Sequence, residues 1–120
     1  MERALEAALS RPISEIKADL FRALAHPARI RVLELLATDE LSVGEIQPLV
    51  GIELSHLSQQ LAVLRRAGLV TTRKVGSSVF YAIRDPELVR LLASAKTLLI
   101  NSLTESQQLL SDLRVDSANA

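Results

Sequence analysis

The sequence predicts a mainly α-helical protein with one small β-hairpin. Apolar residues recur at spacings of three and four along most of the chain, which is typical of amphipathic helices. The period changes to two only between Leu69 and Ile83. Two phenylalanines and one tyrosine are the only aromatic residues, so Leu, Ile, Val and Ala must build the core. Leucine and alanine are also good helix formers, which favours the same fold class.

Helices are expected at the start of the chain. The segment over about 12–25 carries apolar residues at helical spacing, and residues 2–10 are also helix-prone. His26 and Pro27 interrupt the pattern, and Pro27 suits the first turn of a following helix that ends near Thr38. We interpret His26 as a structural residue of this junction, because it lies at a tight turn next to apolar helices.

A short helix is expected after residue 42. Ser42 and Glu45 have the spacing of a capping box, in which each side chain bonds the backbone N–H of the other residue. Pro48 lies beyond the first turn and removes a helical hydrogen bond, so this helix should be short or bent. Gly51 should end it and make the turn.

The next helix is expected over about 54–67. Leu57, Leu61 and Leu64 form its apolar stripe, and Gly68 follows as a terminator. Its N-terminal boundary is open, because Glu53 stands at the expected cap and Ser55 could cap a helix that starts later.

A β-hairpin and a long helix complete the chain. Strands are expected over 69–74 and 79–83, joined by residues 75–78, with Arg73 and Lys74 as a basic arm at the tip. Asp85 and Pro86 suit the cap and first position of the last helix, over about 86–113. The polar tail after Arg114 is expected to fray.

Helix, turn, helix and hairpin in immediate succession is the order of a winged helix-turn-helix protein. With 120 residues, the chain is expected to form a single domain over 1–120. The helix-turn-helix would occupy about 42–67 and the β-wing about 69–84.

Charge is unevenly distributed although the formal net charge is zero. Residues 54–84 contain five basic residues and no Asp or Glu, whereas the rest of the chain holds nine basic and all fourteen acidic residues. Such a window is typical of a nucleic-acid-binding surface. The alternative is an ordinary solvated basic face.

Polar side chains crowd the start of the 54–67 helix, opposite its apolar stripe. Gln can donate and accept a hydrogen bond together, which matches adenine in the major groove, and Ser can serve almost any base or phosphate. The alternative is an exposed polar face without a partner, and for His56 we leave DNA contact and a bystander role equally open. The expected DNA-binding residues are Ser55, His56, Ser58, Gln59, Gln60, Arg73, Lys74 and Ser77.

Three stretches resemble the ArsR/SmtB family of bacterial winged-helix repressors. They are Leu24-Ala25-His26-Pro27-Ala28-Arg29-Ile30-Arg31-Val32-Leu33, Leu57-Ser58-Gln59-Gln60-Leu61-Ala62-Val63-Leu64-Arg65-Arg66-Ala67-Gly68-Leu69-Val70 and Val79-Phe80-Tyr81-Ala82-Ile83. The resemblance implies a homodimer joined through the N- and C-terminal helices, over about 12–25 and 86–113, with two recognition helices entering successive major grooves. The family often has His where Gln60 stands, so the preferred bases of this chain would differ.

A dimer is also expected because the apolar stripe of the last helix is wider than a small core needs. The alternative is packing within one chain only. The expected interface residues are Ile16, Leu20, Leu91, Ala95, Leu98 and Leu99.

The metal and thiol sensors of the family are not expected here. The chain has no cysteine. One metal site of the family resembles a Cys-Val-Cys pattern, and Ser42 and Gly44 stand at the two cysteine positions of that pattern. At a second family site, Asp85 remains but Glu87 replaces His, and Zn²⁺ prefers nitrogen and sulfur ligands. We therefore predict no metal site and no cofactor, and interpret Asp85 as a helix cap.

The sequence thus predicts a cytoplasmic, dimeric, sequence-specific transcriptional repressor that binds double-stranded DNA at an imperfect inverted repeat. A small-molecule effector of unknown identity is left open as a further partner. An enzyme is not expected, because the chain lacks a Cys nucleophile, a plausible Ser–His–acid set and a Gly-rich phosphate loop. The alternative is a winged-helix module that binds another protein. No segment has the length of apolar sequence that a membrane span needs.

Overall fold

The computed structural model of the chain describes residues 2–3, 6 and 10–119, with side chains as far as residue 116. The helix expected over 2–10 falls mostly outside the described residues. Backbone contacts divide the chain into two compact units, residues 1–85 and residues 86–120. The single domain expected over 1–120 stays a prediction.

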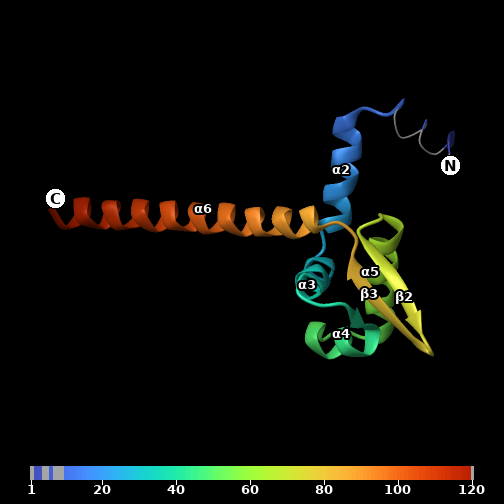
Figure 1. The fold of residues 1–120 in the computed structure, drawn as a ribbon. Coiled ribbons are helices and arrows are strands. Elements are labelled where there is room, and N and C mark those ends of the chain that lie inside the picture. Colours follow the sequence, from blue (N-terminus) through green and yellow to red (C-terminus); the bar gives the residue numbers. More distant parts are fainter. Residues whose placement is uncertain (1, 4–5, 7–9, 120) are drawn as a thin grey trace. The chain divides into compact units, whose positions relative to one another are not determined.

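The first unit contains four helices and a small sheet among its described residues (Figure 1). In chain order the elements are α2 (Ile13–Leu24), α3 (Pro27–Leu36), β1 (Leu41–Ser42), α4 (Val43–Val50), α5 (Leu54–Arg66), β2 (Val70–Val75) and β3 (Ser78–Ile83). The mainly helical winged helix-turn-helix architecture expected from the sequence is confirmed.

One expected N-cap is confirmed, and the structure shows a second that the sequence did not predict. The Nδ1 atom of His26 accepts a hydrogen bond from the backbone N–H of Ala28 at 3.1 Å, so His26 caps α3 and has the structural role expected of it. In the capping box of α4, Ser42 Oγ accepts from the Glu45 N–H at 3.2 Å and Glu45 Oε1 accepts from the Ser42 N–H at 3.0 Å. Together these caps fix where α3 and α4 begin.

Glycines end the two helices of the helix-turn-helix. Gly51 has a φ of 76° and donates to the Gln47 carbonyl after the eight residues of α4, which is short as expected although it contains Pro48. At the end of α5, Gly68 has a φ of 74° and donates to Arg65 O, while the next N–H, of Leu69, donates to Leu64 O. This pair of bonds is a Schellman motif, which requires the left-handed conformation that glycine tolerates best.

The alternative in which Ser55 caps α5 is wrong. Helix α5 starts at Leu54, and Glu53 occupies the cap position without a side-chain hydrogen bond to the helix. The Glu53 carbonyl accepts the first helical hydrogen bond, from Leu57 N at 2.9 Å. Ser55 is therefore inside the first turn, and its side chain is exposed.

The sheet has three strands in the order β1-β3-β2, all antiparallel. The hairpin is confirmed, but its strands extend to Val75 and Ser78, so Gly76 and Ser77 alone make the turn. Strand β1 is missing from the sequence prediction. Its two residues pair with Phe80 and Tyr81 and precede the capping box of α4, so they anchor the start of that helix to the sheet.

Aliphatic side chains of the helices and the sheet form the core of the first unit, as the composition requires. Those with less than 5% of their surface exposed are Val32, Leu33, Leu36, Ile46, Leu57, Leu61, Leu64 and Val70. The apolar stripe expected on α5 is thus confirmed as its buried face, which leaves the opposite face for a partner.

The second unit is one helix, α6 (Pro86–Asn119). It continues past Arg114, where the sequence led us to expect a frayed tail, so that expectation is wrong. Large apolar side chains on it remain exposed, among them Leu98 at 67%, Leu99 at 63% and Leu103 at 65%.

Candidate nucleic-acid interface

Helices α4 and α5 and the turn at residues 51–53 form the helix-turn-helix (Figure 1). On α5, the three buried leucines of the stripe face the core, with at most 1% of their surface exposed. Four of the five polar residues expected to read DNA are exposed on this helix: Ser55, His56, Ser58 and Gln59. Their position in the first two turns is the part of a recognition helix that enters the major groove.

Gln60 does not belong to this exposed face, and its expected exposure is wrong. It is buried, with 8% of its surface exposed, and its Oε1 accepts a hydrogen bond from Arg29 Nε at 2.9 Å. Gln60 follows Gln59 by one residue, a rotation of about 100° around the helix axis. That rotation carries its side chain to the border of the buried stripe, so we leave Gln60 out of the proposed DNA contacts.

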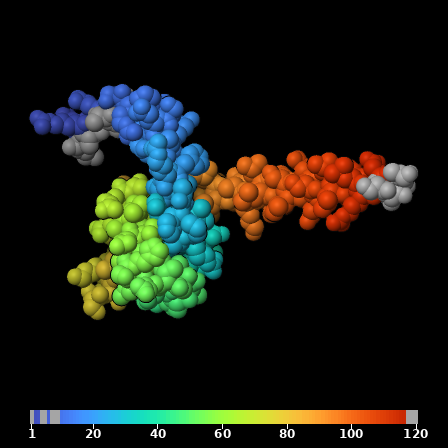
Figure 2. Space-filling model, turned by 180° about the vertical axis from the view of Figure 1, so that it is seen from behind, coloured from blue at the N-terminus to red at the C-terminus, as the bar shows by residue number. Residues whose placement is uncertain are grey.

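The wing presents a free basic side chain near its tip. Lys74 and Ser77 are both exposed, and Lys74 forms no ion pair with any residue that the structure describes. Gly76 at the turn has a φ of 60°, a conformation that favours glycine. Figure 2 shows the wing projecting beyond the surface formed by α4 and α5. Lys74 is therefore placed where it can reach beyond the helix-turn-helix.

Arg73 does not stand at the tip, and it is not free. It lies opposite Phe80 in the hairpin, and its guanidinium forms an ion pair with Glu40 through both Nε and Nη2. The guanidinium also lies 5.4 Å from the centre of the Phe80 ring, within the range of a cation–π contact. The hydrogen bond from Arg73, together with its positive charge, lowers the pKa of Glu40 although slight burial opposes this.

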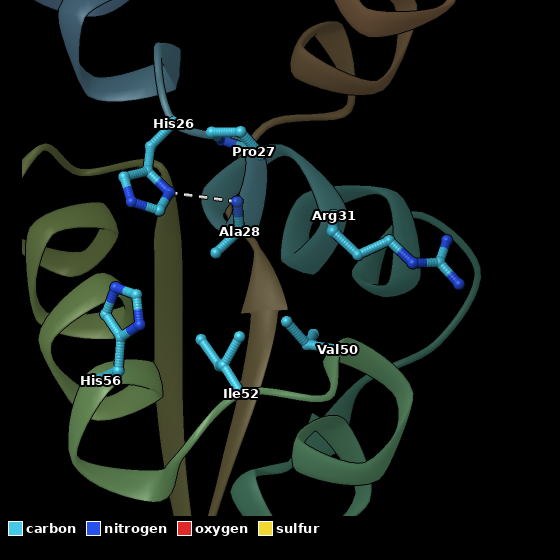
Figure 3. Close-up of a pocket in the computed structure, with 7 residues that line it drawn as sticks. All are labelled: His26, Pro27, Ala28, Arg31, Val50, Ile52 and His56. Atoms are coloured by element: carbon cyan, nitrogen blue, oxygen red, sulfur yellow. Dashed lines mark hydrogen bonds between the residues drawn. The ribbon is translucent and has the colours of Figure 1, made fainter.

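His56 contacts a second histidine. Its ring lies edge-to-face on the ring of His26, with centroids 5.7 Å apart and the ring planes at 81°. The two histidines border a hollow of about 330 Å³ (Figure 3), together with Pro27, Ala28, Arg31, Val50 and Ile52. Figure 3 shows Ile52 and Val50 directed toward this space from the end of α4 and the turn, while the Arg31 guanidinium points away. His56 thus belongs both to the exposed face of α5 and to the wall of this hollow.

Among the residues that the structure describes, no group of three or more His, Asp or Glu side chains is placed to hold a metal ion. No helix in the described part of the chain has the length and apolar character needed to cross a lipid bilayer.

Two interactions of this region were missed by sequence reasoning. Arg29 bonds Gln60 across 31 residues, and Glu40 pairs with Arg73 across 33 residues. Arg29 stood within a stretch recognised only for its family resemblance, and Glu40 lies outside the acid-free window, closer to the start of the chain. Neither contact has a local signal, because both depend on how α3 and the wing pack in three dimensions.

Comparison with known proteins identifies the fold and the function. Residues 24–73 match a family described as a helix-turn-helix domain. The HTH-type transcriptional regulator Rv0081 of Mycobacterium tuberculosis is 49% identical over 106 residues, which are 88% of this chain and 93% of that protein. The crystal structure of Rv0081 matches with a TM-score of 0.74 and covers 80% of this chain and 97% of that chain.

Two further relatives refine this result. The biofilm growth-associated repressor of Agrobacterium fabrum is 44% identical over 73 residues, which are 61% of this chain and 62% of the repressor. The solution structure of Mb0332 from Mycobacterium bovis is described as a homodimeric winged helix-turn-helix DNA-binding domain of a possible ArsR-family regulator. It is 31% identical, with a TM-score of 0.71 over 83% of this chain and 89% of that chain. The chain therefore belongs to the ArsR/SmtB family of winged helix-turn-helix proteins and is a DNA-binding transcriptional regulator.

Proposed function

We propose that the chain acts as a dimeric repressor that binds an imperfect inverted repeat and blocks access to a promoter. One observation carries this proposal: α5 buries Leu57, Leu61 and Leu64 and exposes four polar side chains on the other face. A repressor also stands among its relatives, the biofilm growth-associated repressor. The chain would act by binding, without catalysing a reaction.

The exposed side chains have distinct roles in this proposal. Gln59 can form two hydrogen bonds with adenine, while Ser55 and Ser58 can serve bases or phosphates. His56 lies on the same face and would approach the DNA backbone. On the wing, Lys74 would contact phosphate as a point charge, with Ser77 beside it at the turn.

The dimer would use the apolar side chains that each unit leaves exposed. On α2, Ile13 is 69% and Phe21 54% exposed, and Ile16 is 38% exposed. On α6, the exposed leucines described above continue over several turns. The proposed interface residues are Ile16, Leu20, Leu91, Ala95, Leu98 and Leu99, to which we add Ile13 and Phe21 because they are exposed. The homodimeric state of Mb0332 supports the proposal of a dimer.

Selection of bound fragments from genomic DNA tests the DNA-binding part of the proposal. The bound fragments should share two half-sites related by inversion, with their centres one or two helical turns apart. Binding should weaken steeply with salt, because phosphate contacts release counterions. Fragments without a shared inverted motif, or binding that salt does not weaken, would contradict the proposal and favour a protein partner.

Repression and dimerisation are tested separately. A reporter gene placed behind the selected site should be silenced by the wild-type protein, and activation of the reporter would contradict the repressor role. Leu99→Lys should give a monomer in sedimentation experiments and lose operator binding. Thr97→Lys is the matched control, since it adds the same charge two residues away, about 200° around the same helix.

A small-molecule effector stays a prediction, and the hollow in Figure 3 is a place where a ligand would touch α5 directly.

A further inference from the structure

A single side chain, Arg29, joins three helices of the first unit. From its position on α3, its Nε donates to Gln60 Oε1 of α5 at 2.9 Å. Its Nη1 donates to two carbonyl oxygens at the end of α2, those of Ala23 at 3.0 Å and Arg22 at 3.3 Å. The guanidinium therefore connects the C-terminal end of α2 with the recognition helix.

Two of the groups that Arg29 binds depend on it for a partner, the Ala23 carbonyl and the side chain of Gln60. The Ala23 carbonyl is among the last four of α2, and the residue four ahead of it is Pro27, which has no N–H to donate. The Arg22 carbonyl also accepts from the Ala25 N–H at 3.2 Å, so Arg29 is its second donor, and a cation is favourable at a helix C-terminus. Gln60 is buried, so its side-chain oxygen would lose hydrogen bonds to water without gaining any if Arg29 were absent. The planar guanidinium offers its donors in a fixed fork, whereas the ammonium of a lysine cannot bond both sides with the same geometry.

The hydrogen bonds that Arg29 donates to Gln60, Ala23 and Arg22 form what we call the Arg29 fork. This fork constrains the orientation of α5 in a way that the apolar packing of the helix does not. The buried stripe of Leu57, Leu61 and Leu64 attaches α5 to the core, but the hydrophobic effect is non-directional. Hydrogen bonds weaken steeply as their angles depart from linearity, so they define rotation and translation of the helix more narrowly.

We propose that Arg29 is a positioning residue for DNA recognition, which holds α5 at a defined orientation to the end of α2 through Gln60. The proposal rests on the proposed function, because α5 is the helix that reads the operator. Since α2 carries part of the proposed dimer face, the same fork sets the angle at which each protomer presents its recognition helix. Loss of the fork should therefore reduce the discrimination between operator and unrelated DNA, while phosphate contacts persist.

The test separates positioning from a role in stability alone. Arg29→Leu leaves Gln60 buried without a partner and should destabilise the fold. The double variant Arg29→Leu/Gln60→Leu removes both polar partners, so it should recover much of the stability, because apolar groups then replace the pair. If the fork positions α5, the double variant will fold well but lose about tenfold in its ratio of operator to scrambled-site affinity. Arg22→Leu is the control, because this substitution removes the same charge nearby at a side chain that is 72% exposed.

A second measurement reports the orientation without DNA. The chain has no cysteine, so spin labels can be attached at Lys17→Cys on α2 and Arg66→Cys at the end of α5, both exposed positions. The distance distribution, measured in labelled protein diluted with unlabelled chains, should be narrow with the native fork and broader when the labels are carried by the Arg29→Leu/Gln60→Leu variant. Equal distributions, or a double variant that keeps the wild-type affinity ratio, would overturn the positioning role. A wild-type protein that itself lacks operator preference would instead refute the proposed function, and the spin-label distances would still decide whether the fork orients α5.

Discussion

The ion pair between Glu40 and Arg73 makes a quantitative prediction about DNA binding. In the free protein Arg73 is held by Glu40, although its side chain is 59% exposed and lies on the wing. A phosphate and a carboxylate are alternative partners for the same guanidinium. Glu40→Gln weakens the internal partner with little change in size, so Arg73 should become available to DNA. We expect tighter binding of the Glu40→Gln variant at low salt.

The magnitude follows from the number of phosphates contacted. The logarithm of the binding constant falls with the logarithm of salt concentration, with a slope of about 0.9 for each phosphate neutralised. One additional contact for each protomer gives two for the proposed dimer, so the slope should become steeper by about 1.8. The gain in affinity should accordingly shrink as salt is raised.

The assay is a titration of labelled operator DNA by fluorescence anisotropy at several salt concentrations. Glu34→Gln is the matched control, since it makes the same change in charge at an exposed position of α3. The double variant Glu40→Gln/Arg73→Ala tests the cause directly, because the effect of the Gln should disappear when Arg73 is absent. An unchanged slope in Glu40→Gln, or an equal effect in Glu34→Gln, would refute the reasoning.

Glu40 is ionised at neutral pH, so the DNA titrations can be made there with the ion pair to Arg73 intact. Its pKa is lowered mainly by the hydrogen bond from Arg73, so the ion pair is present above the ordinary carboxyl range and is lost as the pH falls through the lowered pKa. Arg73→Ala should therefore raise the pKa of Glu40 toward its usual value, which a carbon-13 NMR titration of the carboxyl group can follow.

Three further predictions concern base reading, phosphate binding and the core. Gln59→Ala should weaken binding by about 1–3 kcal/mol and relax the base preference at one position of each half-site; an equal loss on all sequences in competition assays would argue against base reading. Lys74→Ala should weaken binding uniformly and flatten the salt slope, and an unchanged slope would remove Lys74 from the interface. Leu61→Ala should lower the free energy of unfolding by about 2–5 kcal/mol in urea denaturation, because Leu61 is 1% exposed. Leu54→Ala, at a position that is 51% exposed, is its control and should cost much less.

Local patterns were sufficient to predict most elements of the fold. The capping box of Ser42 and Glu45, the turn glycines and the leucine stripe of α5 each act within a few residues, so their geometry follows from the sequence around them. Strand β1 was missed because two residues carry no periodicity. It exists only because β3 offers it a partner about 40 residues farther along the chain.

The candidate site was predicted less completely than the fold. Exposure of Ser55, Ser58 and Gln59 follows from helical periodicity, since each lies away from the buried stripe. Gln60 and Arg73 are polar residues in the segment expected to bind DNA, but both form hydrogen bonds with residues far away in the sequence, Arg29 and Glu40. Residue type and spacing give the chemistry that a side chain can perform, whereas its available partners depend on tertiary packing.

The Arg29–Gln60 and Glu40–Arg73 hydrogen bonds limit which side chains of the surface can read DNA bases. With Gln60 bonded to Arg29, Gln59 is the one exposed amide side chain among the described residues of α5, so it is the residue there best suited to a two-bond contact with adenine. In the proposed complex, the remaining discrimination would come from Ser55 and Ser58 and from the angle at which α5 enters the groove. An entry angle held by directional bonds would then contribute to recognition together with the base contacts. For this reason the Arg29 fork and the Gln59 contact should show non-additive effects when both are removed, and additive effects would separate them.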